Sequence, residues 1–251
     1  MGDVRGSKVA AATLGFWIIK ILATTLGETA GDTLSMTFDF GYLASTGIFV
    51  AVLLVLAMAQ VRADRFRPAL YWATIIASTT AGTTLADFAT RSLGIGYAGG
   101  SALLLALVLA SLAAWHFVTG AVKIDHLTDR RSEWFYWLTI SLSQTLGTAL
   151  GDWTADTNGL GYLGGATVFA IALAGIAALY FTTRVNRVAL FWAAFILTRP
   201  LGATVGDFLD KPLAKGGLDF SRPLASTVLL VAIVLLVAVL PQRAKGGITP
   251  G

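Results

Sequence analysis

The sequence predicts an all-α integral membrane protein with eight transmembrane helices, arranged as four parallel two-helix repeats. Three observations predict this fold class. Of the 251 residues, 56% are hydrophobic and only 13% are charged, about half the charged fraction of a soluble domain. Apolar runs of about 20 residues, the length of one membrane span, recur along the whole chain. A single spacing of Trp, Gly and Asp also occurs four times.

The apolar runs and the breaks between them predict where each helix lies. The expected helices cover residues 10–33, 41–61, 68–90, 97–119, 134–155, 162–182, 188–209 and 223–240. The first helix of each repeat carries the Asp motif near its end. The second opens with a Gly-Tyr pair in repeats 1 to 3 and with Gly216-Gly217 in repeat 4. Each repeat is therefore expected to cross the membrane and return.

The repeated motif places Gly ten residues after Trp, Asp five residues after that Gly, and a second Gly nine residues after Asp. The copies are Trp17, Gly27, Asp32 and Gly41; Trp72, Gly82, Asp87 and Gly96; Trp137, Gly147, Asp152 and Gly161; and Trp192, Gly202, Asp207 and Gly216. Small residues four apart share one helix face and let another helix approach closely. We therefore expect the first helices to form an inner bundle and the second helices an outer ring. The small residue before each Asp is expected to let the helix end or unwind.

The intervals between motif aspartates are 55, 65 and 55 residues, which indicates a duplicated pair that was duplicated again. We divide the chain into an N-terminal half, residues 1–125, and a C-terminal half, residues 126–251. Because a two-span repeat keeps its orientation in every copy, the repeats should be related by an axis along the membrane normal. That axis is either pseudo-four-fold or a two-fold relating the halves.

The distribution of Lys and Arg predicts the orientation. Twelve of these bases lie at the termini and between repeats, and four lie in the turns within repeats. The excess places both termini in the cytoplasm of a bacterial inner membrane, and the motif aspartates in the outer leaflet. The motif tryptophans are then expected in an aromatic belt at the inner interface.

Acidic residues inside membrane helices are costly, and they mark functional sites. The candidate metal ligands are Glu28, Asp32, Asp87, Asp152, Asp156 and Asp207. The candidate supporting residues are Lys20, Thr29, Thr83, Thr84, Thr148, Gln144 and Arg199. Six acids against the two deep bases, Lys20 and Arg199, favour a cation as the ligand. Carboxylates and hydroxyls suit hard cations such as Mg²⁺, Ca²⁺ or Mn²⁺.

A purely structural role for the acids is the alternative. Arg91 and Lys211 stand four residues after Asp87 and Asp207, a spacing that allows local ion pairs. Lys20 and Arg199 could likewise pair with a motif acid, compete with a transported ion or take part in proton coupling. His116 and His126 stand away from the Asp motif, and we interpret both as interfacial residues.

The four segments of the form Gly-x-x-x-Gly/Ala-Asp resemble a bacterial family of polytopic membrane proteins built from four copies of a repeat of unknown function. The resemblance runs from about Phe16 to Leu240, and it implies a polytopic inner-membrane protein. A second similarity is limited to repeat 1, where Glu28-Thr-Ala-Gly31-Asp32-Thr33 is similar to an acidic motif of a Mn²⁺ and Ca²⁺ transporter family. Here one extra residue separates Glu from Gly, so the similarity serves as a chemical analogy.

From these patterns we expect a membrane transporter of cations, in particular of a divalent metal such as Mn²⁺, rather than an enzyme. The alternatives are a cation channel with a ring of aspartates, and a membrane scaffold or stress protein without transport activity. The expected partners are the lipid bilayer and a small inorganic cation. The basic residues follow membrane topology and do not indicate nucleic acid. We expect no cofactor other than a bound divalent cation.

Overall fold

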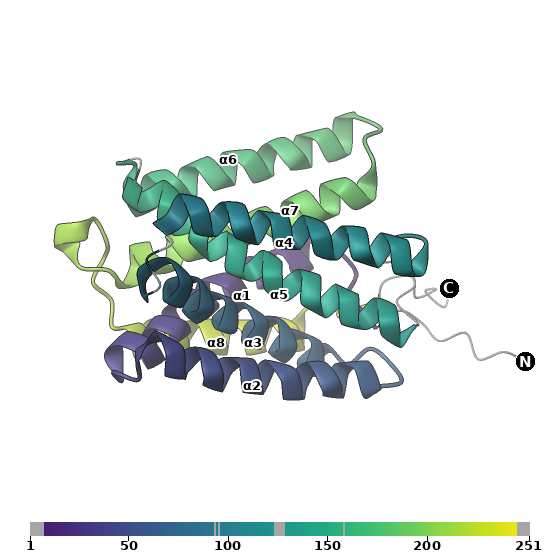
Figure 1. Cartoon of the computed structure of the whole chain (residues 1–251), viewed down its shortest axis with the longest axis horizontal. Helices are drawn as coiled ribbons and strands as arrows, with labels where there is room; N and C mark the ends of the chain where they lie inside the picture. Colours follow the sequence, from purple (N-terminus) through teal and green to yellow (C-terminus); the bar gives the residue numbers. More distant parts are fainter. Residues whose placement is uncertain (1–7, 93, 95, 123–128, 158, 245–251) are drawn as a thin grey trace, which may run out of the picture.

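A computed structural model describes residues 8–92, 94, 96–122, 129–157 and 159–244, and these residues form eight α-helices without a strand (Figure 1). The helices are α1 (Leu14–Asp32), α2 (Gly41–Arg62), α3 (Pro68–Asp87), α4 (Gly96–Thr119), α5 (Arg130–Asp152), α6 (Gly161–Thr182), α7 (Arg187–Asp210) and α8 (Arg222–Val239). The predicted helices all exist, with boundaries displaced by a few residues. The predicted boundary between the halves, at residues 125 and 126, lies outside the described residues.

The α-helix ends at the motif Asp in repeats 1 to 3, which is one of the two predicted outcomes, but the chain does not unwind there. In repeats 1 to 3 it widens into a π-helical turn that starts at the next residue, over Thr33–Thr37, Phe88–Ser92 and Trp153–Thr157. In repeat 4 the α-helix continues to Asp210, and a 3₁₀ turn follows at Leu213–Lys215. Such π turns occur frequently at functional sites. The motif Asp therefore stands where the backbone changes its pitch in three of the four copies.

The backbone conformation favours glycine at the second motif glycine in every copy. Gly41, Gly96, Gly161 and Gly216 have φ angles of 71°, 71°, 64° and 82°. A side chain at these left-handed positions would cost energy that glycine avoids. In repeats 1 to 3 this glycine begins the outer helix, so it sets the angle at which the chain turns back.

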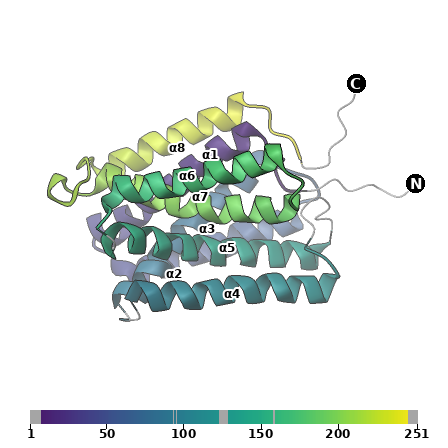
Figure 2. The same ribbon diagram turned by 90° about the horizontal axis from the view of Figure 1, so that it is seen from above.

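The first helices of the repeats form a closed inner ring. α1 packs against α3, α3 against α5, α5 against α7, and α7 against α1. The outer helices are offset by one repeat: α2 packs on α3, α4 on α5, α6 on α7, and α8 on α1 (Figures 1 and 2). The second helix of each repeat thus covers the first helix of the following repeat. As predicted, the helices that carry the Asp motif form the inner bundle.

The first motif glycine makes the close approach within the inner ring. Each one lies against the residue eight positions before the Asp of the following repeat. These contacts are Gly27 with Thr79, Gly82 with Gln144, Gly147 with Arg199, and Gly202 with Thr24. A Cβ atom at Gly82 would lie 2.9 Å from the backbone nitrogen of Thr145. Only glycine allows the ring to close at this distance, which explains why glycine occupies this position in every copy of the motif.

Five helices, α2, α4, α6, α7 and α8, are long and apolar enough to cross a membrane, and they indicate a membrane protein. The inner helices α1, α3 and α5 are more polar because they carry buried threonines and acids. The outer helices expose most of their apolar side chains, whereas the polar side chains of the inner ring are enclosed.

The predicted aromatic belt of motif tryptophans is wrong for three of the four copies. Trp72, Trp137 and Trp192 are buried in the principal hydrophobic core instead of facing outward. They surround a layer that we call the aromatic floor, composed of Phe16, Tyr71, Tyr136 and Phe191. The hydroxyls of Tyr71 and Tyr136 lie 2.9 Å apart, and the rings of Phe16 and Phe191 have centroids 6.4 Å apart. Aromatic side chains thus fill the centre of the ring at the end where α1 begins.

The described ends of the chain meet near this floor. Ala10 and Ala244 form an isolated antiparallel bridge, and the Lys8 amine lies 2.7 Å from the Glu133 carboxylate. The same amine donates a hydrogen bond to the carbonyl of Val61. These contacts tie the segment before α1 to the last turn of α2 and the first turn of α5.

Candidate functional site: a buried acid cluster

The motif aspartates converge at the end of the inner ring opposite the aromatic floor. Together with two further acids they form a group that we call the acid cluster: Glu28, Asp32, Asp87, Asp152, Asp207 and Asp210. Each is no more than 4% exposed. Oxygens of Glu28, Asp32 and Asp87 lie within 4.8 Å of one another, and so do those of Glu28, Asp152 and Asp207. Glu28 therefore lies between the acids of all four repeats.

Arg91 joins two repeats within the cluster. Its guanidinium lies 3.0 Å from the carboxylate of Asp87 in its own repeat and 3.1 Å from that of Asp152 in the next repeat. The local pair was predicted from the spacing, whereas the second contact depends on the ring. Tyr42 at the start of α2 accepts a hydrogen bond from the same guanidinium at 3.4 Å.

Lys211 makes the corresponding bridge between repeats 4 and 1. Its amine lies 3.0 Å from Asp207 and 2.5 Å from Asp32. It directly follows the last residue of α7. Burial disfavours the charged amine, but the carboxylates of Asp207 and Asp32 outweigh this effect and raise the pKa of Lys211 well above its usual value.

Asp210 belongs to the cluster but was missed from the sequence. Its carboxylate lies within 4.8 Å of ligand oxygens of Asp32 and Asp207, and it forms an ion pair with Arg222 at 3.5 Å. The signal was its place three residues after Asp207, which puts both side chains on one helix face.

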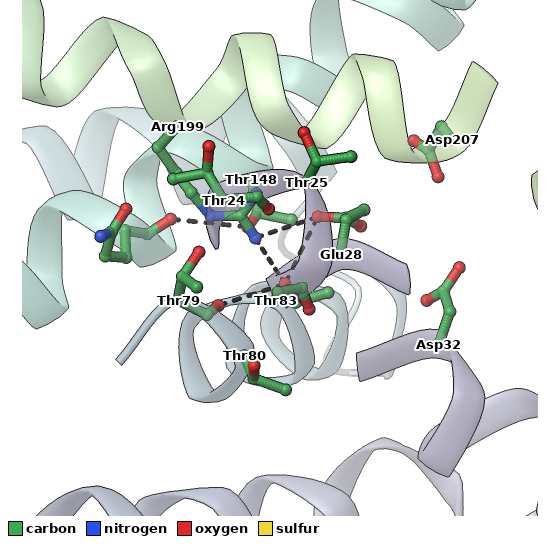
Figure 3. Close-up of polar contacts among 12 residues, drawn as sticks. Thr24, Thr25, Glu28, Asp32, Thr79, Thr80, Thr83, Thr148, Arg199 and Asp207 are labelled. Carbon is green, nitrogen blue, oxygen red and sulfur yellow. Dashed lines mark hydrogen bonds and ion pairs between the residues drawn. The ribbon is translucent and has the colours of Figure 1, made fainter. Parts of the chain in front are cut away.

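A second layer of polar side chains, centred on Arg199 and Thr83, lies beside Glu28 of the acid cluster (Figure 3). The guanidinium of Arg199 lies 2.9 Å from the carboxylate of Glu28 and also donates to the hydroxyl of Thr83. Thr83 donates to the carbonyl of Gly27 at 3.0 Å. Arg199 and Glu28 are both buried, so this network fixes α1, α3 and α7 together.

The other predicted supporting residues divide into two groups. Thr148 and Gln144 belong to the inner ring, and the buried amide of Gln144 has no hydrogen-bond partner for either of its polar atoms in the part of the chain that the structure describes. Thr29 instead contacts Ser226 of α8 at 2.9 Å, and Thr84 donates back to the carbonyls of its own helix. These two threonines therefore do not join the polar layer through a hydrogen bond.

Lys20 and Asp156 lie apart from the acid cluster. The Lys20 amine is fully buried, stands 4.2 Å from the ring centroid of Phe195, and has no hydrogen-bond partner within the described residues. Asp156 is exposed and accepts a hydrogen bond from the Tyr97 hydroxyl at 2.9 Å. His116 is exposed, and His126 lies outside the described residues.

The charge count predicted from sequence needs correction. Asp156 leaves the set of buried acids and Asp210 enters it. Lys20 forms no described ion pair, whereas Arg91, Lys211 and Arg222 join Arg199 among the bases that contact the cluster. Six carboxylates thus face four bases, which leaves an excess of two negative charges when every group is ionised. Within the described residues, at least one carboxylate oxygen has no hydrogen-bond partner in each of five acids, Asp32, Asp87, Asp152, Asp207 and Asp210.

The arrangement offers closely spaced carboxylate oxygens in a site from which solvent is excluded. Such oxygens are the preferred ligands of hard divalent cations, which a twofold negative excess would neutralise. The same oxygens could instead share protons among themselves.

Comparison with known proteins finds one family. The chain matches the family described as a repeat of unknown function (DUF347) in four segments, residues 15–66, 70–121, 135–186 and 190–243. Each segment contains one motif and its two helices. No match was found among curated proteins or among solved structures.

Proposed function

Since the chain belongs to the DUF347 repeat family, we propose a function from the feature that its four repeats build together: it is a membrane transporter of cations, in particular of a divalent metal such as Mn²⁺. The observation that carries the proposal is the convergence of buried carboxylates from all four repeats within 4.8 Å. Five of the clustered acids keep at least one oxygen without a hydrogen-bond partner among the described residues. Acidic residues within membrane segments are costly, and ion pathways are among the functional sites that they mark.

The proposal includes the finer topology. All eight α-helices cross a bacterial inner membrane, with both termini in the cytoplasm and the repeats around an axis along the membrane normal. The helix lengths of 18 to 24 residues support this topology, because about 20 residues cross the hydrocarbon core. The one-repeat offset of the outer helices supports a pseudo-four-fold arrangement of the backbone. The bridges made by Arg91 and Lys211 give the acid cluster a two-fold pattern.

Transport is favoured over a channel because the centre of the ring is closed on one side. The aromatic floor lies below the polar layer, and Lys20 and Phe195 lie between them. A conformation that passes ions must open this floor. An acid cluster closed at the floor and enclosed by its bridging bases has the properties of an occluded transport site.

The scaffold alternative rests on a specific observation: each motif Asp contacts Arg91 or Lys211. If ion pairing were the whole role of the acids, neutralising one would cost stability and no cation would bind. Thermal unfolding of the purified protein across a panel of Mg²⁺, Ca²⁺, Mn²⁺ and Na⁺ tests this. A metal-specific rise in the unfolding temperature supports a cation site.

Flux through proteoliposomes tests the transport proposal directly. Asp32→Asn should abolish Mn²⁺ uptake while the protein remains folded. Asp39→Asn is the matched control, because Asp39 is exposed and its φ of 58° suits Asn as well as Asp. Equal Mn²⁺ uptake by wild type and Asp32→Asn would contradict the proposal. Flux that does not saturate would instead favour a channel.

A further inference from the structure

We propose that Arg91 and Lys211 are resident counter-cations of the acid cluster: they fill it when no metal is bound, and they swing toward water when a metal cation enters. This inference rests on the proposed function and names how the same site is regulated. It begins from one column of the repeat, four residues after the motif Asp. That column holds Met36, Arg91, Asp156 and Lys211 in repeats 1 to 4.

The two bases make the same pair of contacts in alternate repeats. Arg91 contacts the motif Asp of repeat 2 and that of repeat 3, and Lys211 contacts the motif Asp of repeat 4 and that of repeat 1. Both bridges therefore lie where the N-terminal half meets the C-terminal half. Within the described residues, no ion pair joins the motif Asp of repeat 1 to repeat 2, or that of repeat 3 to repeat 4.

Each bridging base stands beside carboxylates that would coordinate a metal. The amine of Lys211 lies within 3.0 Å of Asp32 and Asp207, whose oxygens form one of the close acid groups together with Asp210. A divalent cation bound between Asp32 and Asp207 would repel this amine at short range. Metal and amine therefore compete for the same oxygens.

Arg91 is partly open to water, and Lys211, whose side chain is 9% exposed, stands at the end of its helix. The Arg91 side chain is 30% exposed and belongs to the π turn after α3. Lys211 follows the last residue of α7, and its carbonyl carbon would lie 2.6 Å from a Cβ atom at Gly217. Repeats 1 to 3 have Tyr at the position of Gly217. The loss of that side chain in repeat 4 makes room for the Lys211 backbone.

Arg199 provides the contrast. Its side chain is fully buried, and its guanidinium donates to Glu28, Thr83 and the carbonyl of Thr24. It is a fixed counter-charge from the polar layer below. When Arg91 and Lys211 leave, the excess negative charge of the cluster rises from two to four, which favours a divalent cation over the empty cluster.

Lysine acylation on the full-length protein in detergent tests the movement of Lys211. A short pulse of acylating reagent is applied with and without Mn²⁺, and Lys211 and Lys215 are quantified by mass spectrometry. Lys215 is the internal control, because it is exposed on the same segment. Mn²⁺ should raise Lys211 acylation several-fold and leave Lys215 unchanged. Protection of Lys211, or no change while Mn²⁺ binds, would overturn the inference.

Equilibrium Mn²⁺ binding provides the second test. Lys211→Gln and Arg91→Gln should each tighten Mn²⁺ binding by at least about tenfold, because a competing charge at contact distance is removed. Lys215→Gln, at an exposed position on the same segment, should bind as wild type does. If wild type binds Mn²⁺ and neither Gln variant binds it more tightly, the counter-cation role is wrong and the transport proposal stands.

If wild type and every variant bind no Mn²⁺, the proposed function fails and this inference fails with it. Thermal unfolding identifies a variant that does not fold. In that event the acylation of wild-type Lys211 decides the question, because it requires no substitution.

Discussion

The guanidinium of Arg199 on α7 lies 2.9 Å from the carboxylate of Glu28 on α1, between residues 171 positions apart in the sequence. Both side chains are buried, and neither charge has access to bulk water. This pair joins the last inner helix to the first. It therefore holds the ring closed from within, below the bridges made by Arg91 and Lys211.

Breaking that pair on one side should be costly. Glu28→Gln leaves the Arg199 charge buried and without a carboxylate, and we expect a loss of about 3–5 kcal/mol in the free energy of unfolding. Arg199→Gln should cost a similar amount. The double variant should lose less than the sum of the two, by about 0.5–3 kcal/mol. Reversible unfolding in mixed micelles measures the cycle, and strict additivity would show that the two side chains do not interact.

A side chain at Gly202, where α7 and α1 approach closely, is expected to lower the free energy of unfolding through steric overlap. A Cβ atom there would lie 2.8 Å from the backbone carbonyl carbon of Thr24, so Gly202→Ala should force α7 and α1 apart at a cost of about 1–3 kcal/mol. Gly175 on α6 is the control, because nothing lies within 4 Å of its Cβ position. Gly175→Ala should gain up to about 1 kcal/mol from helix propensity. Equal unfolding midpoints for the two variants would contradict this account of the motif glycine.

Replacing Lys20 by an apolar residue is expected to stabilise the protein. Its buried amine has a cation–π contact with Phe195 but no hydrogen-bond partner within the described residues. Removing an uncompensated buried polar group is worth about 1–3 kcal/mol, so Lys20→Met should raise the unfolding temperature. Lys215→Met, at an exposed position, should have little effect. A lower unfolding temperature for Lys20→Met would show that the amine has a partner that stabilises the fold.

Asp152 and Asp156 should behave differently although both were predicted ligands. Asp152 is buried in the acid cluster, whereas Asp156 is exposed and contacts only Tyr97 by hydrogen bond within the described residues. In the Mn²⁺ uptake assay, Asp152→Asn should abolish transport and Asp156→Asn should retain most of it. Loss of uptake in the Asp156 variant alone would place the cation path outside the cluster described here.

Much of the fold could be predicted from the sequence because its signals are local. Apolar runs gave the helices to within a few residues, and the glycine spacing gave the inner bundle. The placement of Trp72, Trp137 and Trp192 went wrong because tryptophan suits both a membrane interface and a buried core. Only the packing of neighbouring inner helices distinguishes these two environments.

The acid cluster could be predicted in part, for a related reason. Repetition of Asp identified its four central members, and the spacing of four residues identified the local partners Arg91 and Lys211. Their second contacts, to Asp152 and Asp32, join different repeats. Spacing within one helix carries no information on which helix packs beside it. The bridges between repeats, and the charge balance that depends on them, could therefore be seen only once the order of helices in the ring was known.

The packing of the last outer helix on the first inner helix has a consequence for how the protein is synthesised. α8 covers α1, and Ser226 of α8 contacts Thr29 of α1, yet nearly 200 residues of chain separate these partners. At 5–20 residues per second, α1 waits about 10–40 s after its own synthesis for its cover. Of the eight described helices, α1 is therefore synthesised first and enclosed last. Its polar face must therefore be sheltered by other means until the ribosome has finished α8.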